Sequence, residues 1–500
     1  MQGRIYDVAV IGGGISGAAI ARDAAGRGLA VFLCEEGDLA GGSSSATTKL
    51  VHGDLGQLER LNLAAMREAV VEREILMRAA PHLVRPLTFH IPHHERQWSP
   101  AAFSAGLFAF DHVARRSLPR SRRVHLERED AHGPLHPHFT LAFAYADCVA
   151  DDSRLVILNA LDARAHGAVI QTRLRCTVAE RDGGRWRLSL EDTMSGERSV
   201  MQARILVNAA GAAAGDALNH IVHAQQQVRV RMTKASHIVV RWPHPGGTAY
   251  ALPNADGRIV YAVPYAPGTM LLGPAVSAYA GDPASAAVEP REVGYLIDVA
   301  HQYFQPLLHP DDVLWAFAGV SALPDEPAAL RRGRAVIVEA PPNVAPLISV
   351  FGGSLTTHRR LAELAVDRMG KFRKLPPAWT DKVPLPGGNF PRDGEGDIAR
   401  ALRAGYPFIS EVHAARLVRA YGTRASAVLT GTRSAADLGE RFVDDLTEAE
   451  VRYLRHDEWA ETAEDVLWRR SKLGLEATAA EAEALDAAMA RIGRHAVTIG

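Results

Sequence analysis

The strongest constraint on the fold is a glycine-rich turn that follows a short apolar run near the N-terminus. Residues 6–11 (YDVAVI) are apolar and β-branched and predict a buried parallel strand, and residues 15–28 predict a helix. Between them Gly12, Gly14 and Gly17 form the spacing G-x-G-x-x-G. The first glycine permits a tight turn, the second lets backbone approach a pyrophosphate, and the third lets the helix pack on the strand.

A second strand and an acidic residue complete this unit. Residues 30–35 (AVFLCE) predict a strand, which makes the segment a βαβ unit. Glu35 ends that strand 18 residues past Gly17, where a carboxylate can accept hydrogen bonds from a ribose diol. An acid at this place argues against a 2′-phosphate. The sequence therefore predicts a dinucleotide cofactor bound by Gly12, Gly14, Ser16, Gly17 and Glu35.

Three further segments favour FAD as that dinucleotide. Residues 41–59 contain a run of small hydroxyl residues, which offers donors close to a phosphate and a ring. Residues 205–211 (ILVNAAG) end in small residues where backbone could pack on adenine. Residues 349–359 place two glycines before a predicted helix N-terminus, which suits the flavin pyrimidine, where negative charge develops on reduction. The predicted FAD contacts here are Ser44, Ser45, Thr47, Lys49, Gly211, Gly352, Gly353, Leu355, Thr356 and Thr357.

The length of 500 residues and the pattern along the rest of the chain predict an α/β protein of three domains. Residues 168–206 and 228–276 alternate polar and apolar positions and predict strands, whereas the pattern beyond about residue 390 is helical. We expect a split, doubly wound Rossmann-type FAD-binding domain, an inserted antiparallel β-sheet substrate domain and a C-terminal all-helical domain. The predicted boundaries are 1–80, 145–225 and 335–375 for the first, 81–144 and 226–334 for the second, and 385–500 for the third.

Composition excludes several classes of protein. The 56 basic and 57 acidic residues give a net charge of −1, so no overall field attracts nucleic acid. The three cysteines fit neither a disulfide framework nor a zinc site, and no metal is expected. No signal peptide or spanning apolar run is recognisable, which predicts a cytoplasmic protein. Residues 107–123 join apolar side chains to arginines, and both peripheral contact with an anionic membrane surface and a buried helix followed by a basic loop stay open.

Longer stretches resemble the FAD-dependent, quinone-linked glycerol-3-phosphate dehydrogenase family. They lie between residues 5 and 475 and include DVAVIGGGISGAAIARDAAGRGL, SSSATTKLVHG, ARILVNAAG, KASHIVV, FGGSLTTHRRLAE and HDEWAETAEDVLWRRSKLG. The resemblance implies oxidation of a small-molecule substrate, glycerol 3-phosphate, to dihydroxyacetone phosphate, with hydride passing to the flavin and electrons to a quinone. It also implies a homodimer at the inner face of the cytoplasmic membrane. His237 and Arg332 match positions at the substrate, and His237, near its ordinary pKa, would accept the alcohol proton.

The family's substrate cations are replaced in this chain. Gly56 and Ser321 stand where the family pattern has arginines, and Ser354 stands where it has a lysine. Gln57 replaces a tyrosine, and Asp54 adds a negative charge. A charge-assisted hydrogen bond contributes roughly 1.5–3 kcal/mol. Three such losses would cost roughly 5–9 kcal/mol if additive, or about three to six decades in the affinity for a phosphate dianion.

Three interpretations remain open on the sequence alone. The first is a glycerol-3-phosphate dehydrogenase whose phosphate site is rebuilt from other residues: Arg231, Arg331, Arg332, Arg334 and His358. The second is a flavin enzyme for an uncharged or cationic alcohol or amine, with Asp54 facing a substrate ammonium. The third is a flavoprotein that has lost turnover and serves as a binding module.

Overall fold

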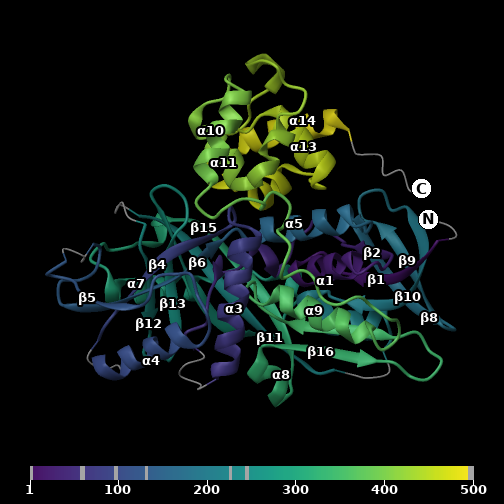
Figure 1. Ribbon diagram of the computed structural model, residues 1–500, viewed down its shortest axis with the longest axis horizontal. Helices are drawn as coiled ribbons and strands as arrows, with labels where there is room; N and C mark the ends of the chain where they lie inside the picture. The colour runs from purple at the N-terminus through teal and green to yellow at the C-terminus, as the bar shows by residue number, and fades with distance from the viewer. Residues whose placement is uncertain are drawn as a thin grey trace.

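The structure is a computed structural model that describes residues 4–56, 62–94, 99–129, 133–224, 228–242 and 247–493. For Arg331 and Arg332 it describes the backbone alone. The predicted substrate position Gln57 lies outside the described residues. Figure 1 shows two sheets side by side, with the C-terminal helices above them.

The first sheet is built around the glycine turn. Its eight strands in the described residues follow the order β16-β17-β10-β1-β2-β7, with β8 and β9 joined to β10. Their bounds are β1 Ile5–Ile11, β2 Val31–Cys34, β7 Val169–Gln171, β8 Leu174–Asp182, β9 Arg185–Asp192, β10 Arg198–Asn208, β16 Arg334–Glu339 and β17 Leu347–Gly352. The strands from β17 to β7 run parallel, and β1 lies at the centre between β2 and β10. Segments far apart in the sequence therefore form one domain.

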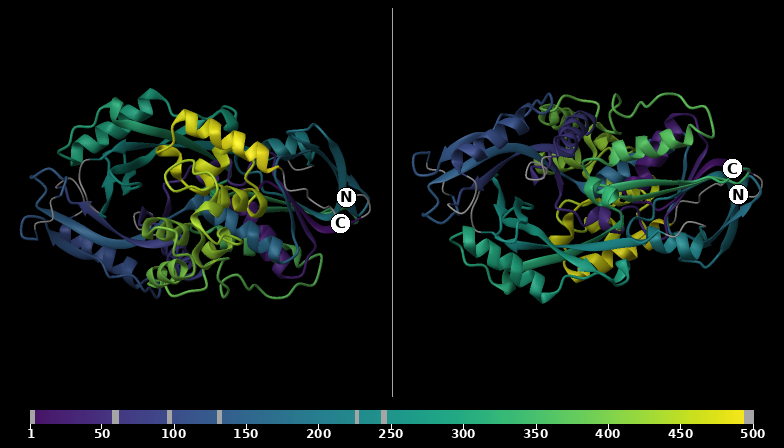
Figure 2. Two further views of the ribbon diagram at one scale, coloured as in Figure 1. Left: turned by 90° about the horizontal axis from the view of Figure 1, so that it is seen from above. Right: turned by 90° about the horizontal axis from the view of Figure 1, so that it is seen from below.

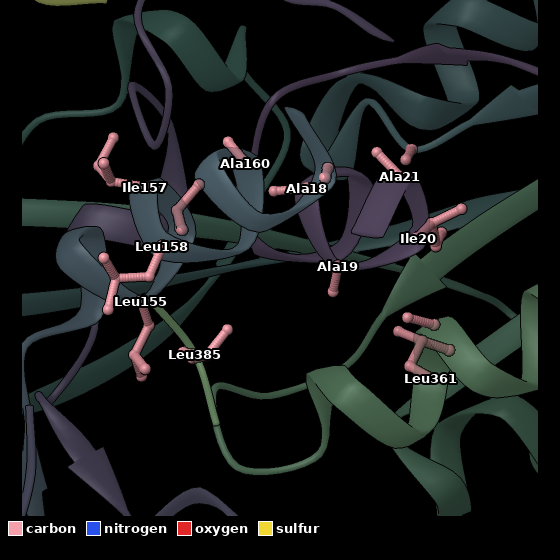
Figure 3. Close-up of a cluster of buried hydrophobic side chains, with 14 of the residues drawn as sticks. Ala18, Ala19, Ile20, Ala21, Leu155, Ile157, Leu158, Ala160, Leu361 and Leu385 are labelled. Carbon is pink, nitrogen blue, oxygen red and sulfur yellow. The ribbon is translucent and has the colours of Figure 1, made fainter. Parts of the chain in front are cut away.

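Three helices cover one face of this sheet: α1 (Ile15–Gly26), α5 (Asp152–Ala165) and α9 (His358–Met369). Small side chains make α1 fit, because alanines let it approach both the strands and α5 closely. Figure 3 shows that contact, with residues drawn from α1, α5, α9 and the linker: Ala18, Ala19, Ile20, Ala21, Leu155, Ile157, Leu158, Ala160, Leu361 and Leu385. The opposite face packs against the β8–β9 hairpin and the short helical segment 214–221, which includes α6 (Ala214–Asp216).

The second sheet holds nine strands among the described residues, in the order β15-β11-β14-β13-β12-β4-β6-β3, with β5 paired to β6. Their bounds are β3 Leu50–Val51, β4 Val84–Pro92, β5 Arg122–His125, β6 Leu141–Ala150, β11 Val230–Arg241, β12 Ala249–Pro253, β13 Ile259–Pro264, β14 Thr269–Tyr279 and β15 Val313–Pro324. Pairing is antiparallel except between β4 and β12. The predicted domain boundary at residue 145 falls inside β6, whose pairing with β4 continues to Ala150, so a division after β6 fits the strands better.

Four helices accompany the second sheet or border it: α3 (Leu63–Ala79), α4 (Pro100–His112), α7 (Pro290–Tyr303) and α8 (Pro327–Arg332). The helix α7 buries its apolar side on the sheet through Leu296, Val299 and Ala300. In contrast, α4 leaves Phe108 64% exposed. Within the described residues, the structure has no helix that combines the length and the apolar character needed to cross a bilayer.

The C-terminal domain is helical and has a hydrophobic core of its own. Its α-helices are α10 Glu395–Gly405, α11 Glu411–Tyr421, α12 Ala425–Val428, α13 Glu448–Asp457 and α14 Ala479–Ile492. Seen from above, these helices lie over the middle of an elongated body (Figure 2). They cover α5, of which every residue from Asp152 to Ala163 is buried.

Buried ion pairs fasten this domain to the first sheet. Arg154 of α5 binds Glu458, and both side chains are fully buried. Asp38, in the loop after β2, accepts hydrogen bonds from Arg469 at 2.7 Å and from Arg470 at 2.8 Å. Removing one partner of such a pair leaves an uncompensated buried charge, which costs about 3–5 kcal/mol. The C-terminal domain is therefore docked in one arrangement.

A buried histidine at the same junction gives the protein a sensitivity to acid. His82 is 1% exposed and lies against Gly387, Gly422 and Phe390. Neither of its ring nitrogens has a hydrogen-bond partner within the described residues. Burial, and then the charge of Arg154, lowers the pKa of His82 to about 3. Because the unfolded chain binds this proton near pH 6.5, folding stability falls as the pH drops below about 6.5.

We expect the variant His82→Leu to lose less stability in acid than the parent protein. Between pH 7.5 and pH 5 the difference in the loss of unfolding free energy should approach about 2 kcal/mol. The thermal unfolding midpoint at the two pH values measures it, with the exposed His125→Leu as the control. Equal midpoint shifts in the parent and His82→Leu would contradict a neutral buried His82.

Candidate functional site

The glycine turn leaves no room for larger residues. A Cβ on Gly17 would lie 1.9 Å from the carbonyl oxygen of Gly12, and one on Gly12 would lie 2.5 Å from that of Ala209. Helix α1 begins after Gly14, which provides no side-chain cap, and its first turn carries no acid. Its N-terminus thus presents backbone donors and a positive dipole end. This arrangement fits the pyrophosphate of a dinucleotide.

Glu35 is held beside that turn. Its carboxylate accepts a hydrogen bond from the Gly13 amide at 2.6 Å and another from the Gly37 amide at 2.9 Å. Burial raises the pKa of this carboxyl above its usual range. The residue predicted to bind a ribose is therefore fixed at the end of β2, next to the predicted pyrophosphate site.

Residues 43–49, the flavin loop, lie within the predicted flavin-binding segment 41–59 and are organised around one buried carboxylate. Asp152 accepts hydrogen bonds from Lys49 Nζ at 2.6 Å and from the Thr47 hydroxyl at 2.8 Å. Lys49 Nζ also donates to the Ser45 carbonyl oxygen, and the Ser44 hydroxyl accepts from the Ile15 amide. Burial opposes ionisation of Asp152, but the neighbouring lysines hold its pKa at about 2. The loop is thus joined to both α1 and α5.

The second sheet lies directly on this loop. His237 of β11 has its Nε2 3.0 Å from the Thr48 hydroxyl. Its ring stacks on Phe317 of β15, with centroids 5.0 Å apart and planes 13° apart. A Cβ on Gly319 would lie 2.8 Å from the Ala46 carbonyl oxygen, and one on Gly273 would lie 2.4 Å from the His237 ring. His237 is therefore enclosed between strands and the flavin loop.

The expected ordinary pKa of His237 is not found. Burial, and then the charge of Lys49, lowers the pKa of this imidazole to about 3. The cause is its place between two layers of the structure, with 1% of the residue exposed. The imidazole is therefore neutral across the physiological range, able to accept a proton but only as a weak base.

A second loop closes the site from the other side. Gly352 and Gly353 adopt φ values of 63° and 93°, which favour glycine. The Thr356 hydroxyl accepts a hydrogen bond from the His52 amide at 3.0 Å and so joins this loop to the segment 52–56. A Cβ on Gly352 would lie 2.3 Å from the side chain of Leu323, so the loop also touches β15. Helix α9 begins only at His358, after the turn that contains Leu355, Thr356 and Thr357.

The remaining predicted contacts lie on the same side of the first sheet. Gly211, at φ 60°, comes shortly after the end of β10. It follows Ala209 and Ala210, which lie against Gly12. Ser16 lies in the first turn of α1. The structure thus brings the predicted FAD-binding residues to the ends of β1, β2, β10 and β17 and to the loop against them.

The candidate phosphate ligands are engaged elsewhere wherever their side chains are described. Arg231 pairs with Asp325 at 2.8 Å, and Arg334 pairs with Glu68 at 2.5 Å. His358 is buried, donates a hydrogen bond from Nδ1 to the Leu355 carbonyl oxygen, and has a pKa that burial lowers to about 4. The side chains of Arg331 and Arg332 lie outside the described part of the structure. Ser321 and Ser354, which replace two family cations, are exposed.

Several residues that shape the site were not among the predicted site residues. Thr48, Phe317 and Asp152 contact or support His237 and the flavin loop. Lys472, from the C-terminal domain, reaches Asp152 and Ser153. The available signal was the acidic pair Asp151-Asp152, but nothing local indicated its partners more than 100 residues away.

Two family models cover nearly the whole chain. Residues 7–368 match the FAD dependent oxidoreductase model, and residues 378–496 match the model for the C-terminal domain of alpha-glycerophosphate oxidase. The second match begins close to the predicted start of the helical domain.

Named relatives align along almost the full length. The glycerol-3-phosphate dehydrogenase of Pseudomonas aeruginosa is 44% identical over 94% of this chain and 92% of its own. The D-erythritol 1-phosphate dehydrogenase of Brucella abortus is 40% identical over 95% and 96%. Among solved structures, the FAD complex of the glycerol-3-phosphate dehydrogenase from Bacillus halodurans has a TM-score of 0.77 at 25% identity, covering 98% of this chain and 90% of the other. FAD is accordingly the cofactor that this site is built to bind.

The glycine turn yields a direct test of the cofactor site. We expect Gly17→Ala to give protein with little bound flavin, because its Cβ would overlap the Gly12 carbonyl and push α1 away from β1. The ratio of visible flavin absorbance to protein absorbance of the purified variant measures this. Gly184→Ala is the matched control, since a Cβ there meets nothing within 4 Å. Full flavin content in Gly17→Ala would contradict the assigned turn.

Proposed function

This chain belongs to the FAD-dependent glycerol-3-phosphate dehydrogenase family, and from that premise we propose that it oxidises the secondary alcohol of a small polyol. It is an FAD-dependent oxidoreductase, and bound FAD supplies the acceptor for the hydride that leaves the alcohol carbon. The proposal concerns the substrate and the residues that act on it.

The observation that carries this proposal is the position of His237. A neutral imidazole is held by Thr48 of the predicted flavin loop and by the face of Phe317. We assign to His237 the acceptance of the hydroxyl proton while the carbon loses hydride. The strands β11 and β15 would exclude water from that contact, and Lys49 would hold the loop beneath it. Arg332 remains the second proposed substrate residue.

Glycerol 3-phosphate is the first candidate substrate, because the Pseudomonas aeruginosa relative, 44% identical over almost its full length, is a glycerol-3-phosphate dehydrogenase. A polyol without phosphate, or an amine facing Asp54, is the second candidate. The observation that favours the second is the neutral residues Gly56, Ser321 and Ser354 at positions where the family pattern has cations, combined with the engagement of Arg231 and Arg334 by carboxylates. A phosphate dianion needs cationic donors, whereas hydroxyl groups are satisfied by serine and backbone.

A quinone is the proposed electron acceptor, reached from the cytoplasmic face of the membrane. Support comes from α4, where exposed Phe108 is followed by the exposed residues Arg115, Arg120, Arg122 and Arg123. Apolar and cationic side chains together suit the surface of an anionic bilayer. Assembly as a homodimer is proposed from the family resemblance alone.

Anaerobic reduction of the flavin tests the substrate. We expect visible absorbance to fall when polyols are added to the purified holoprotein without oxygen. Loss of absorbance with sub-millimolar glycerol 3-phosphate would establish the first candidate and a new set of phosphate ligands. Loss only with glycerol, erythritol or amines would establish the second. A flavin that dithionite reduces but no alcohol or amine reduces would contradict the proposed function and leave a binding module.

The double variant Ser321→Arg, Ser354→Lys is the matched test of the same site. Restoring two charge-assisted contacts should lower the KM for glycerol 3-phosphate by at least about tenfold. An unchanged KM would show that these two positions do not face the substrate phosphate.

The pH dependence tests the assignment of His237. Because a base must be unprotonated, a histidine of pKa about 3 stays active down to about pH 4. We expect kcat/KM to show no inflection near pH 6.5. We also expect His237→Asn to lower kcat about 10²-fold, which is the low end of the range for general bases because His237 is a weak base. FAD content serves as the control. An inflection near 6.5 that His237→Asn removes would contradict the buried neutral state.

A further inference from the structure

One segment of the C-terminal domain touches both sheets at once. Residues Asp465–Arg470 form a single turn of π-helix. This geometry is rare in proteins, and where it occurs it is often at a functional site. Arg469 and Arg470 point to Asp38 in the loop after β2. Trp468 packs in the other direction, 4.4 Å from Trp315 of β15 between ring centroids. The segment therefore lies where the flavin domain, the second sheet and the C-terminal domain meet.

Lys472 extends this segment to the flavin loop. Its backbone is left-handed, with φ 64°, and its Nζ lies 2.7 Å from the Ser153 hydroxyl and 3.4 Å from Asp152 Oδ1. The other oxygen of the same carboxylate, Oδ2, accepts from Lys49 and Thr47. One oxygen of Asp152 thus faces the C-terminal domain, and the other faces the loop. Fixing the first oxygen fixes the orientation of the second.

The charge count at this point shows why Lys472 matters. Asp151, Asp152, Lys49 and Lys472 together carry no net charge. Without Lys472 the group carries one uncompensated negative charge beside the fully buried Asp152, which binds the loop predicted to meet an anionic cofactor. Lysine is also rare here, since 50 of the 56 basic residues are arginine. Three of the six lysines, Lys49, Lys234 and Lys472, reach inward to carboxylates.

We infer that Lys472 is a positioning residue for FAD: by holding Asp152 it keeps residues 43–49 in the conformation that binds the cofactor. The C-terminal domain is then part of the cofactor site although it is far from it in sequence. This inference rests on FAD as the cofactor and not on the identity of the substrate.

The affinity of apoprotein for FAD tests the inference. The holoprotein is stripped of FAD, and the apoprotein is titrated with FAD while flavin fluorescence is followed. We expect Lys472→Met to raise the Kd for FAD about tenfold or more and to shift the visible spectrum of the flavin that still binds. Lys472→Arg should restore most of the affinity, because a cation of similar reach returns. Ser153→Ala, a milder change, should raise the Kd about threefold.

The control is another contact between α5 and the C-terminal domain. Arg164 lies 3.5 Å from Asp457 and over the ring of Trp459, at the opposite end of α5 from Asp152. Arg164→Met should leave the Kd for FAD unchanged. An equal rise in the Kd for FAD in Lys472→Met and Arg164→Met would overturn the inference, because weaker docking of the C-terminal domain would then explain both.

The variant Thr47→Val distinguishes the contribution of the flavin loop to FAD binding from that of Lys472. This variant removes the hydroxyl that binds Asp152 and should also weaken FAD binding. If Thr47→Val weakens binding while Lys472→Met and Ser153→Ala leave it within twofold, the loop assignment survives and the role of Lys472 is wrong. If none of the three weakens binding, both assignments fail.

Discussion

The buried carboxylate of Asp152 is the interaction on which the rest of the site depends. An isolated charge at this depth would be costly, so it exists only because lysines from two directions and backbone amides surround it. One lysine comes from the flavin loop and the other from the C-terminal domain. The requirement to neutralise one carboxylate therefore draws three separate parts of the chain together. Substituting Asp152 would disturb all of them at once.

The same burial decides the chemistry available above the loop. The layers that enclose His237 remove water from its ring and keep it neutral. Cations near the site are largely engaged in structure: Lys49 and Lys472 by Asp152, and Arg334 by Glu68. Among the described side chains at this place, the neutral imidazole of His237 lies beside the Thr48 hydroxyl.

The predictable part of this protein was local, and the unpredictable part was long-range. The strand, the turn and the helix around Gly12 and Gly17 could be predicted because each residue type has a steric reason visible within a short window. The two-sheet division followed from alternation along the strands. The pairing of Asp152 with Lys49 and Lys472, separated by 103 and 320 residues, could not be read from any window. The lowered pKa of His237 likewise arises from segments that meet only in the fold.

Family membership and substrate choice reside in different residues of this structure. The family models match the part of the chain that contains the glycine turn and the flavin loop, and also the helical domain that covers α5. The replaced positions Gly56, Ser321 and Ser354 carry small neutral residues, and Ser321 and Ser354 are exposed. Relatives of about equal similarity act on phosphates of different polyols. A chain can thus retain the cofactor machinery under tight physical constraint while its substrate pocket changes charge at little structural cost.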